Sequence, residues 1–145
     1  MKLKQLSVFL ENKPGTLSAA CRLLGDAKVN IQTFALADTQ QFGILRLIVR
    51  EWERAKLTLE KNGFVVKTTD VVAVEVADRP GGLAEVLEVI EQTRINVEYM
   101  YAFTIKHNRN GWLVFRFDNP DAAIAALLAK GLKVVEAEQL FDLHG

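Results

Sequence analysis

The sequence is poor in the residues that most often build catalytic and metal sites. Cys21 is the only cysteine among 145 residues, so the chain can form no internal disulfide and no cysteine-based metal site. The two histidines are His107, in a predicted loop, and His144, beside the C-terminal residue. No motif typical of metalloproteases, serine hydrolases or phosphate-binding loops is present. We therefore expect no catalytic residue, no metal site and no cofactor.

Long apolar runs and an excess of one charge are also missing. No apolar run approaches the roughly 18 residues of a membrane-spanning helix, and Met1–Leu6 lacks the apolar segment of a secretion signal. Lysine and arginine number 18, as do aspartate and glutamate, so the formal net charge is zero. Such a balance argues against a nucleic-acid or anionic membrane partner. We expect a globular cytoplasmic protein that binds neither nucleic acid nor membrane.

What the sequence does contain is one unit written twice. An offset of 66 residues pairs Pro14-Gly15-Thr16-Leu17 with Pro80-Gly81-Gly82-Leu83. Past the middle of each half, the offset becomes 68 and pairs Gly43 with Gly111, which we expect at hairpin turns. A repeat of this length predicts a repeated architecture with paired sites. Because a unit near 70 residues buries only about 60% of its unfolded surface, each half should need a neighbour.

Each half predicts the order strand, helix, strand, strand, helix, strand. We expect the α+β class, with two ferredoxin-like βαββαβ repeats side by side and two helices on one face of each antiparallel sheet. The repeat places one domain at 1–69 and the other at 70–145. The last strand is expected at 132–138. In the first predicted helix, Cys21 falls on an apolar stripe with Leu24, so we expect it to be a small core residue.

The two Pro-Gly turns are the candidate binding sites. Each joins the end of a strand to the start of a helix, where backbone N–H groups lack partners and the helix dipole is positive. Such a helix start is a natural seat for a carboxylate or a phosphate. Gly15 and Gly81 have no side chain that would block an approach to this backbone. The alternative is that proline and glycine here are ordinary turn residues.

A second polar position is repeated, with Asn30 in the first half and Asn96 in the second. Each stands between apolar residues at the start of a predicted strand. An asparagine amide can offer both a donor and an acceptor to a zwitterion. The alternative is an ordinary turn asparagine before a strand.

Together these motifs resemble those of tandem ACT-domain proteins over nearly the whole chain. Asp78–Leu83 matches the family's Asp-x-Pro-Gly-x-Leu turn, whereas the first turn departs from it with Asn12 in place of aspartate. The resemblance implies small-molecule sensing modules that pair side by side and hold an amino acid at the seam between two domains. It implies these ligand-binding residues: Asn12, Lys13, Pro14, Gly15, Thr16, Leu17, Asn30 and Ile31 in the first half, and Asp78, Arg79, Pro80, Gly81, Gly82, Leu83, Asn96 and Val97 in the second.

The resulting hypothesis is a stand-alone regulator of amino-acid metabolism that binds a small ligand and is not an enzyme. We expect a homodimer that acts on a regulated enzyme in trans. Three alternatives remain open at this point. One is a small ferredoxin-like enzyme with Arg79 as an anion binder, and another is a ligand-free structural dimerisation module. The third is an RNA-recognition module that would need Trp112, Phe115 or Phe117 on an open strand face.

Overall fold

The computed structural model describes residues 1–38, 41–103 and 110–142. The histidines His107 and His144 lie outside the described residues.

The chain folds into two compact units. Lys4–Thr69 forms the first unit, and Asp70–Gly145 forms the second unit together with Met1–Leu3. Two ion pairs attach the N-terminal residues to the second unit. The Met1 amino group lies 3.5 Å from Glu136 Oε2, and Lys2 Nζ lies 3.2 Å from Asp121 Oδ1.

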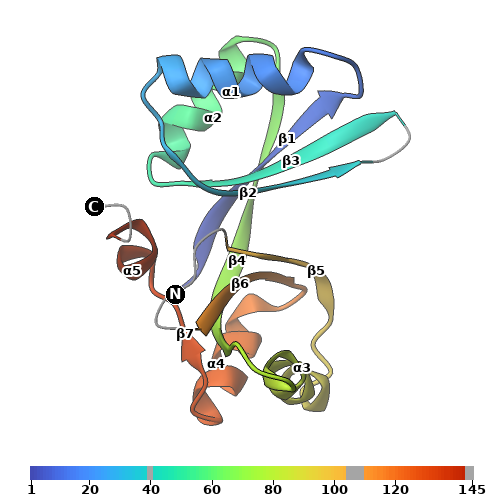
Figure 1. The fold of residues 1–145 in the computed structure, drawn as a ribbon, viewed down its shortest axis with the longest axis vertical. Coiled ribbons are helices and arrows are strands. Elements are labelled where there is room, and N and C mark those ends of the chain that lie inside the picture. Colours follow the sequence, from blue (N-terminus) through green and yellow to red (C-terminus); the bar gives the residue numbers. More distant parts are fainter. Residues whose placement is uncertain (39–40, 104–109, 143–145) are drawn as a thin grey trace. The chain divides into compact units, whose positions relative to one another are not determined.

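The first unit is a four-stranded antiparallel sheet with two helices on one face (Figure 1). Its elements are β1 (Leu3–Glu11), α1 (Thr16–Asp26), β2 (Ile31–Asp38), β3 (Phe42–Val49), α2 (Trp52–Lys61) and the start of β4 (Val65–Ala77). The strand order is β2-β3-β1-β4, so β2 is an edge strand.

The second unit repeats this plan with the rest of β4 as its first strand. The elements that follow are α3 (Gly82–Gln92), β5 (Val97–Ala102), β6 (Asn110–Phe117), α4 (Pro120–Ala129), β7 (Lys133–Val134) and α5 (Ala137–Asp142). The order β7-β4-β6-β5 makes β5 the edge strand at the position equivalent to β2. The predicted α+β class with two βαββαβ-like units is thereby confirmed.

Each unit has its own apolar core between the sheet and its helices. Equivalent positions of the repeat fill both cores, because the same strand and helix faces turn inward in each unit. The first core includes Leu6, Val8, Ala20, Leu24, Ala55 and Leu59, and the second includes Val72, Val74, Val86, Ile90, Ala123 and Leu127. Burial of each large aliphatic side chain contributes about 1.5–3 kcal/mol.

The prediction that Cys21 is a core residue is wrong, because its side chain is exposed. The buried residues of α1 are Ala20 and Leu24, and Leu23 and Ala27 pack against the same core. The helix is therefore rotated so that the flank with Leu23 and Ala27 meets the sheet.

The strand expected at 132–138 is also wrong beyond its first residues. Only Lys133–Val134 forms a strand, and helix α5 follows. The Glu136 backbone N–H donates to Gln139 Oε1 at 3.0 Å, which satisfies a free amide at the start of α5. Leu140 then anchors the helix, since its side chain is fully buried.

Gly43 and Gly111 lie inside strands and not at the hairpin turns where we expected them. Gly43 is opposite Leu10 of β1, and Gly111 is opposite Val76 of β4. Each glycine therefore flanks the strand end that leads into a Pro-Gly turn.

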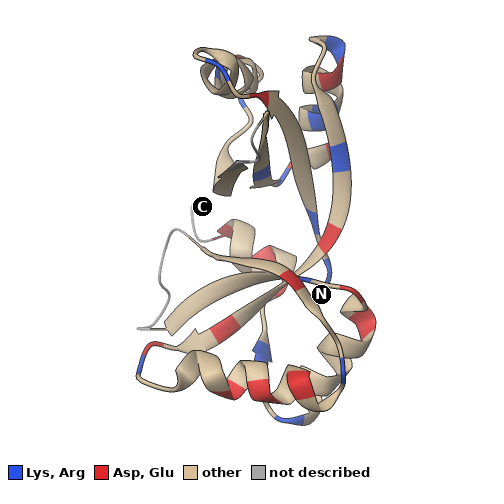
Figure 2. Ribbon diagram, turned by 90° about the vertical axis from the view of Figure 1, so that its right-hand side faces the viewer, with Lys and Arg blue, Asp and Glu red and all other residues tan. Residues whose placement is uncertain are grey.

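The zero net charge of the chain hides opposite charges in its two halves. Residues 1–69 contain eleven lysines and arginines against six acidic residues, whereas residues 70–145 contain seven against twelve. Figure 2 shows the acidic residues concentrated in the second unit, several of them along α3. Contacts between unlike units of separate chains would therefore be electrostatically favoured over contacts between like units.

Candidate functional site

The two Pro-Gly turns adopt the same backbone conformation at equivalent places. We call Asn12–Gly15 the first corner and Asp78–Gly81 the second corner. Gly15 (φ 91°) and Gly81 (φ 85°) are the N-caps of α1 and α3, and both lie in the left-handed region. That conformation favours glycine whether or not a ligand binds. Neither N-cap provides a side-chain hydrogen bond. The first helical N–H groups, those of Thr16 and Gly82, donate to the Lys13 and Arg79 carbonyl oxygens at 3.4 and 3.0 Å.

A pocket lies at each corner. The first has a volume of about 180 Å³ and the second about 210 Å³. Equivalent positions line the two pockets. They are a residue near the end of β1 or β4, the first two corner residues, a leucine of the first helical turn, and a glycine of β3 or β6. These are Leu10, Asn12, Lys13, Leu17 and Gly43 in the first pocket, and Val76, Asp78, Arg79, Leu83 and Gly111 in the second.

The basic residue of each corner is already paired with a glutamate. Lys13 Nζ lies 3.1 Å from Glu11 Oε2, and Arg79 Nη2 lies 2.7 Å from Glu85 Oε1. The glutamates come from different places, because Glu11 ends β1 whereas Glu85 lies in the first turn of α3. Both pairs are more than half exposed, so neither adds much stability. Their effect on the pocket is to neutralise its cation.

The sequence-predicted site residues fall into three groups. The pocket walls include Asn12, Lys13, Leu17, Asp78, Arg79 and Leu83. The turns and helix starts contain Pro14, Gly15, Thr16, Pro80, Gly81 and Gly82. The remaining four, Asn30, Ile31, Asn96 and Val97, do not line the corner pocket of their own unit. Ile31 and Val97 pack against the two cores, which is a structural role.

Asn30 and Asn96 are exposed at the starts of the two edge strands. Leu36, which lines the first pocket, lies six residues beyond Asn30 along the extended β2, a distance of roughly 20 Å. The Asn96 backbone N–H donates to Asp118 Oδ1 at 3.0 Å, and the Asn96 carbonyl oxygen accepts from the Asp118 N–H at 3.2 Å. The backbone of Asn96 is thus fixed by bonds that do not use its side chain.

These features agree with the comparisons to known proteins. The sequence matches the ACT domain pair family over residues 1–144. The chain belongs to this family. None of the curated proteins compared with it is significantly similar.

Solved structures share the fold of this chain. Protein BT0572 of Bacteroides thetaiotaomicron is 37% identical with a TM-score of 0.90, over 97% of this chain and 96% of that chain. The ligand-free regulatory subunit of aspartate kinase from Thermus thermophilus is 13% identical with a TM-score of 0.64, over 87% and 91% of the two chains. The second similarity concerns the fold.

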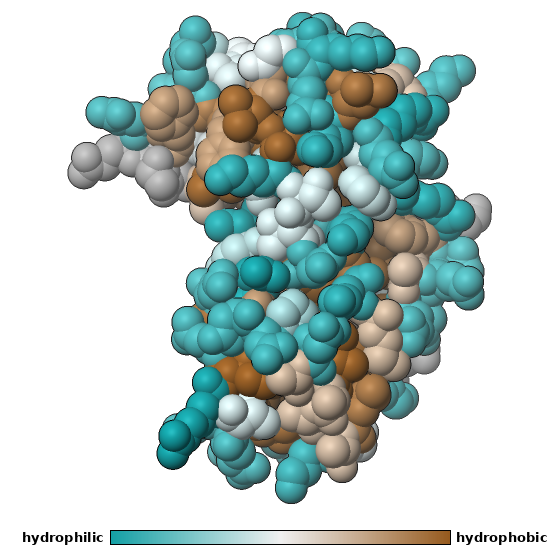
Figure 3. Space-filling model, turned by 180° about the vertical axis from the view of Figure 1, so that it is seen from behind, coloured by the Kyte–Doolittle hydropathy of each residue, from teal (hydrophilic) through white to brown (hydrophobic). Residues whose placement is uncertain are grey.

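The edge of the first ACT domain exposes apolar side chains. Phe34 and Leu36 of β2 are 57% and 53% exposed, and Phe42 of β3 is 48% exposed. Figure 3 shows apolar surface on the first unit near the end of β2 and the start of β3. An edge strand with free backbone groups and apolar side chains is suited to pairing with another strand.

Sequence reasoning missed several pocket residues. Gly43 and Gly111 line the two pockets, and their equivalence in the repeat was the available signal. The sequence alone also does not explain why position 82 is glycine, whereas the equivalent position of the first ACT domain is Thr16. A Cβ on Gly82 would clash with the carbonyl oxygen of Ala77, so this corner is tighter than the first.

A further pocket of about 280 Å³ lies in the second unit around Glu75. Trp112 Nε1 donates to Glu75 Oε1 at 3.1 Å, and Lys133 Nζ lies 3.5 Å from Glu75 Oε2. Both carboxylate oxygens are engaged, so Glu75 is not set up as a general base. Phe9 stands at the equivalent position of the first unit and lines a pocket of about 320 Å³ there with Phe64 and Val65, the counterparts of Leu132 and Lys133. The pocket is therefore repeated, but the carboxylate is not.

The aromatics that an RNA-recognition module would need are inside the protein. Trp112 is 3% exposed, and Phe115 and Phe117 are fully buried, so none offers a face for base stacking. Within the described residues, no group of three or more His, Cys, Asp or Glu side chains could hold a metal ion. No described helix combines the length and the apolar character needed to cross a membrane.

Proposed function

We propose that this chain is a regulatory protein whose ACT domains bind an amino acid at the seam between paired domains. The observation that carries the proposal is the pair of corner pockets, which repeat the same lining positions in both units. A single pocket at a helix start could be incidental. Two copies at equivalent positions, each at a helix N-terminus with a glycine N-cap, favour a shared binding role.

The size of each pocket supports a site completed by a second domain. Small-molecule sites usually enclose about 300–1,000 Å³, whereas the two equivalent corner pockets measure about 180 and 210 Å³. Lys13 and Thr16 also line a separate pocket of about 320 Å³ that extends to Phe9 and Phe64. If two edge strands pair antiparallel, the start of one strand lies beside the end of the other. Asn30 or Asn96 of one domain would then face the corner of its neighbour. Within its own domain, Asn30 lies roughly 20 Å from the Leu36 wall of the corner pocket.

The chemistry of such a seam suits a zwitterion. The N–H groups in the first turn of α1 or α3 would hold a carboxylate, and the amide of Asn30 or Asn96 would bind the polar head from the other side. Leu17 and Leu36, or Leu83 and Leu113, would contact the ligand's side chain. Asn12 in place of an aspartate makes the first corner less acidic than the second, so we expect unequal affinities.

We propose a cytoplasmic homodimer that regulates an enzyme in trans and is itself not an enzyme. The exposed apolar edge of β2 supports association with a second copy. The fold shared with the regulatory subunit of an aspartate kinase supports a role beside a separate catalytic chain.

Thermal unfolding against each of the twenty common amino acids tests the proposal. A ligand at a hundred times its Kd adds about 2.7 kcal/mol, which corresponds to about 5–10 °C in Tm for a chain of this size. One amino acid, or a small group of similar ones, should give this shift. A flat response across the panel would contradict the proposal and favour a ligand-free dimerisation module.

A further inference from the structure

Four helices of this chain end in the same left-handed geometry. The residue after each C-cap has a positive φ: Lys28 (60°), Gly63 (87°), Arg94 (63°) and Gly131 (75°). After α1, the Lys28 N–H donates to the Gly25 carbonyl at 3.0 Å and the Val29 N–H donates to the Leu24 carbonyl at 2.9 Å. Helices α2 and α4 end with the same two bonds.

The chain uses glycine at two of these positions and a cation at the other two. Gly63 and Gly131 are equivalent in the repeat, and so are Lys28 and Arg94. Glycine is the residue that this conformation favours, because a Cβ crowds the backbone there. The backbone conformation therefore does not explain a long side chain at Lys28 or Arg94. After α2 and α4, where the conformation is the same, the chain has glycine.

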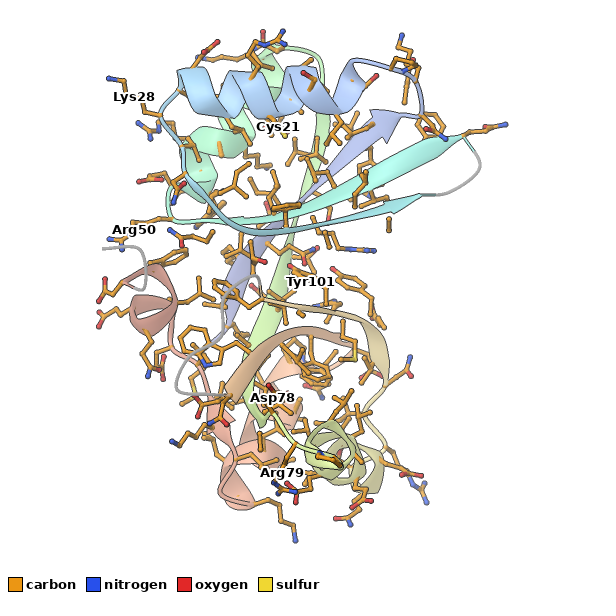
Figure 4. The ribbon with its side chains drawn as sticks, in the orientation of Figure 1. Cys21, Lys28, Arg50, Asp78, Arg79 and Tyr101 are labelled. Carbon is orange, nitrogen blue, oxygen red and sulfur yellow. The ribbon has the colours of Figure 1, made fainter. Side chains whose placement is uncertain are left out.

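A favourable interaction with the helix dipole does not require a cation at either of these two positions. A cation anywhere in the last turn interacts favourably with a helix C-terminus. Lys61 supplies one to α2 without a left-handed backbone. Lys28 and Arg94 are exposed and form no ion pair with any other residue in the described ranges. Figure 4 shows Lys28 pointing away from the first unit.

The corner pockets lack an unpaired positive charge, which Lys28 and Arg94 carry. The cations of the corners, Lys13 and Arg79, are held by Glu11 and Glu85, and the second corner has Asp78 in addition (Figure 4). A ligand carboxylate in a corner pocket would contact helix N–H groups, but each cation there is already in an ion pair with a glutamate.

We propose that Lys28 and Arg94 are ligand-binding residues that provide the positive charge for the ligand's carboxylate. This inference rests on the proposed function. Each residue precedes Asn30 or Asn96 by two positions, or about 7 Å of extended chain. Antiparallel pairing of edge strands that brings the asparagine to a neighbouring corner brings the cation there as well. The ligand would therefore be an amino acid with a free, negatively charged carboxylate, and not the corresponding neutral amide.

Three full-length double variants test the assignment. K28N/R94N removes both charges and keeps a residue that tolerates the left-handed backbone, and K28G/R94G also removes the strain. K61N/K130N is the matched control, because it removes two charges from the ends of α2 and α4. Kd is measured by calorimetry with the amino acid that raises the wild-type Tm most, and with the amide of that amino acid. Sedimentation reports the oligomeric state.

We expect Kd for the amino acid to rise about 10- to 100-fold in K28N/R94N, the usual effect of losing a charge-assisted hydrogen bond. Kd for the amide should stay the same, as should both constants in K61N/K130N. K28G/R94G should bind as weakly as K28N/R94N while its ligand-free Tm rises by about 2–4 °C per site.

Two results would overturn the inference and leave the proposed function standing. One is an unchanged Kd in K28N/R94N. The other is dissociation of a dimer in that variant without ligand, which would assign the two cations to a contact between chains. If no amino acid shifts the wild-type Tm, the proposed function fails, and this inference fails with it.

Discussion

Three glycine-to-alanine substitutions separate backbone strain from steric clash at the corners. Gly81 has a φ of 85°, and a Cβ there would meet nothing within 4 Å. Its neighbour Gly82 has an ordinary backbone, but a Cβ there would clash with the carbonyl oxygen of Ala77. Gly25, in the last turn of α1, has neither problem. The same added methyl group therefore tests three different physical situations.

The expected magnitudes follow from these environments. A left-handed alanine at position 81 costs about 1–2 kcal/mol, offset by about 0.4–1 kcal/mol because alanine restricts the unfolded chain. The net loss for Gly81→Ala is about 1 kcal/mol. Gly82→Ala should lose about 2 kcal/mol, since overpacking against backbone costs about 3 kcal/mol and helix propensity returns about 1. Gly25→Ala should gain about 0.5 kcal/mol.

Urea unfolding followed by far-ultraviolet circular dichroism measures these differences in the free energy of unfolding. The expected order of stability is Gly25→Ala, wild type, Gly81→Ala and Gly82→Ala. Wild-type stability in Gly81→Ala would show that the corner does not hold a left-handed residue. Equal losses in Gly81→Ala and Gly82→Ala would show that the close approach of Gly82 to Ala77 is not maintained.

Three other predictions concern binding, the core and association. Asn96→Ala should raise the Kd of the amino acid several-fold and leave ligand-free unfolding unchanged, because only the backbone of Asn96 bonds to Asp118; a collapse of ligand-free stability in urea would make Asn96 structural. Leu59→Ala should lose about 2–5 kcal/mol in the same assay, since the side chain is fully buried, and a loss below 1 would contradict its place in the core. Association of two chains should weaken between about 0.05 and 0.5 M salt if oppositely charged units meet; a constant sedimentation profile would exclude that arrangement.

The repeat made the fold predictable, because both copies place apolar residues on the same faces of their strands and helices. Ala55 and Leu59 predicted Ala123 and Leu127, and all four are buried. The errors arose where one copy departs from the other. Nothing in the first half corresponds to α5, whose signal was local: Glu136 and Gln139 stand at the spacing of a capping box.

The rotation of α1 could not be read from its apolar residues alone. Ala20 and Leu24 have apolar neighbours on both flanks, with Leu17 and Cys21 on one and Leu23 and Ala27 on the other. Packing against the sheet chose the second flank, which left Cys21 outside. The candidate site was predictable at the corners, because the Pro-Gly turn is a local motif. The pocket walls contributed by β2 and β3 depend on strand register, and a one-residue error in a predicted register turns the other face of the strand toward the pocket.

The exposed thiol on α1 makes this protein easy to label. A maleimide dye would attach at one defined place in each polypeptide, since Cys21 is the sole cysteine and is open to solvent. Fluorophores carried by separate copies could then exchange energy once those copies associate. Meeting and parting of subunits could in this way be followed in real time, without introducing any mutation.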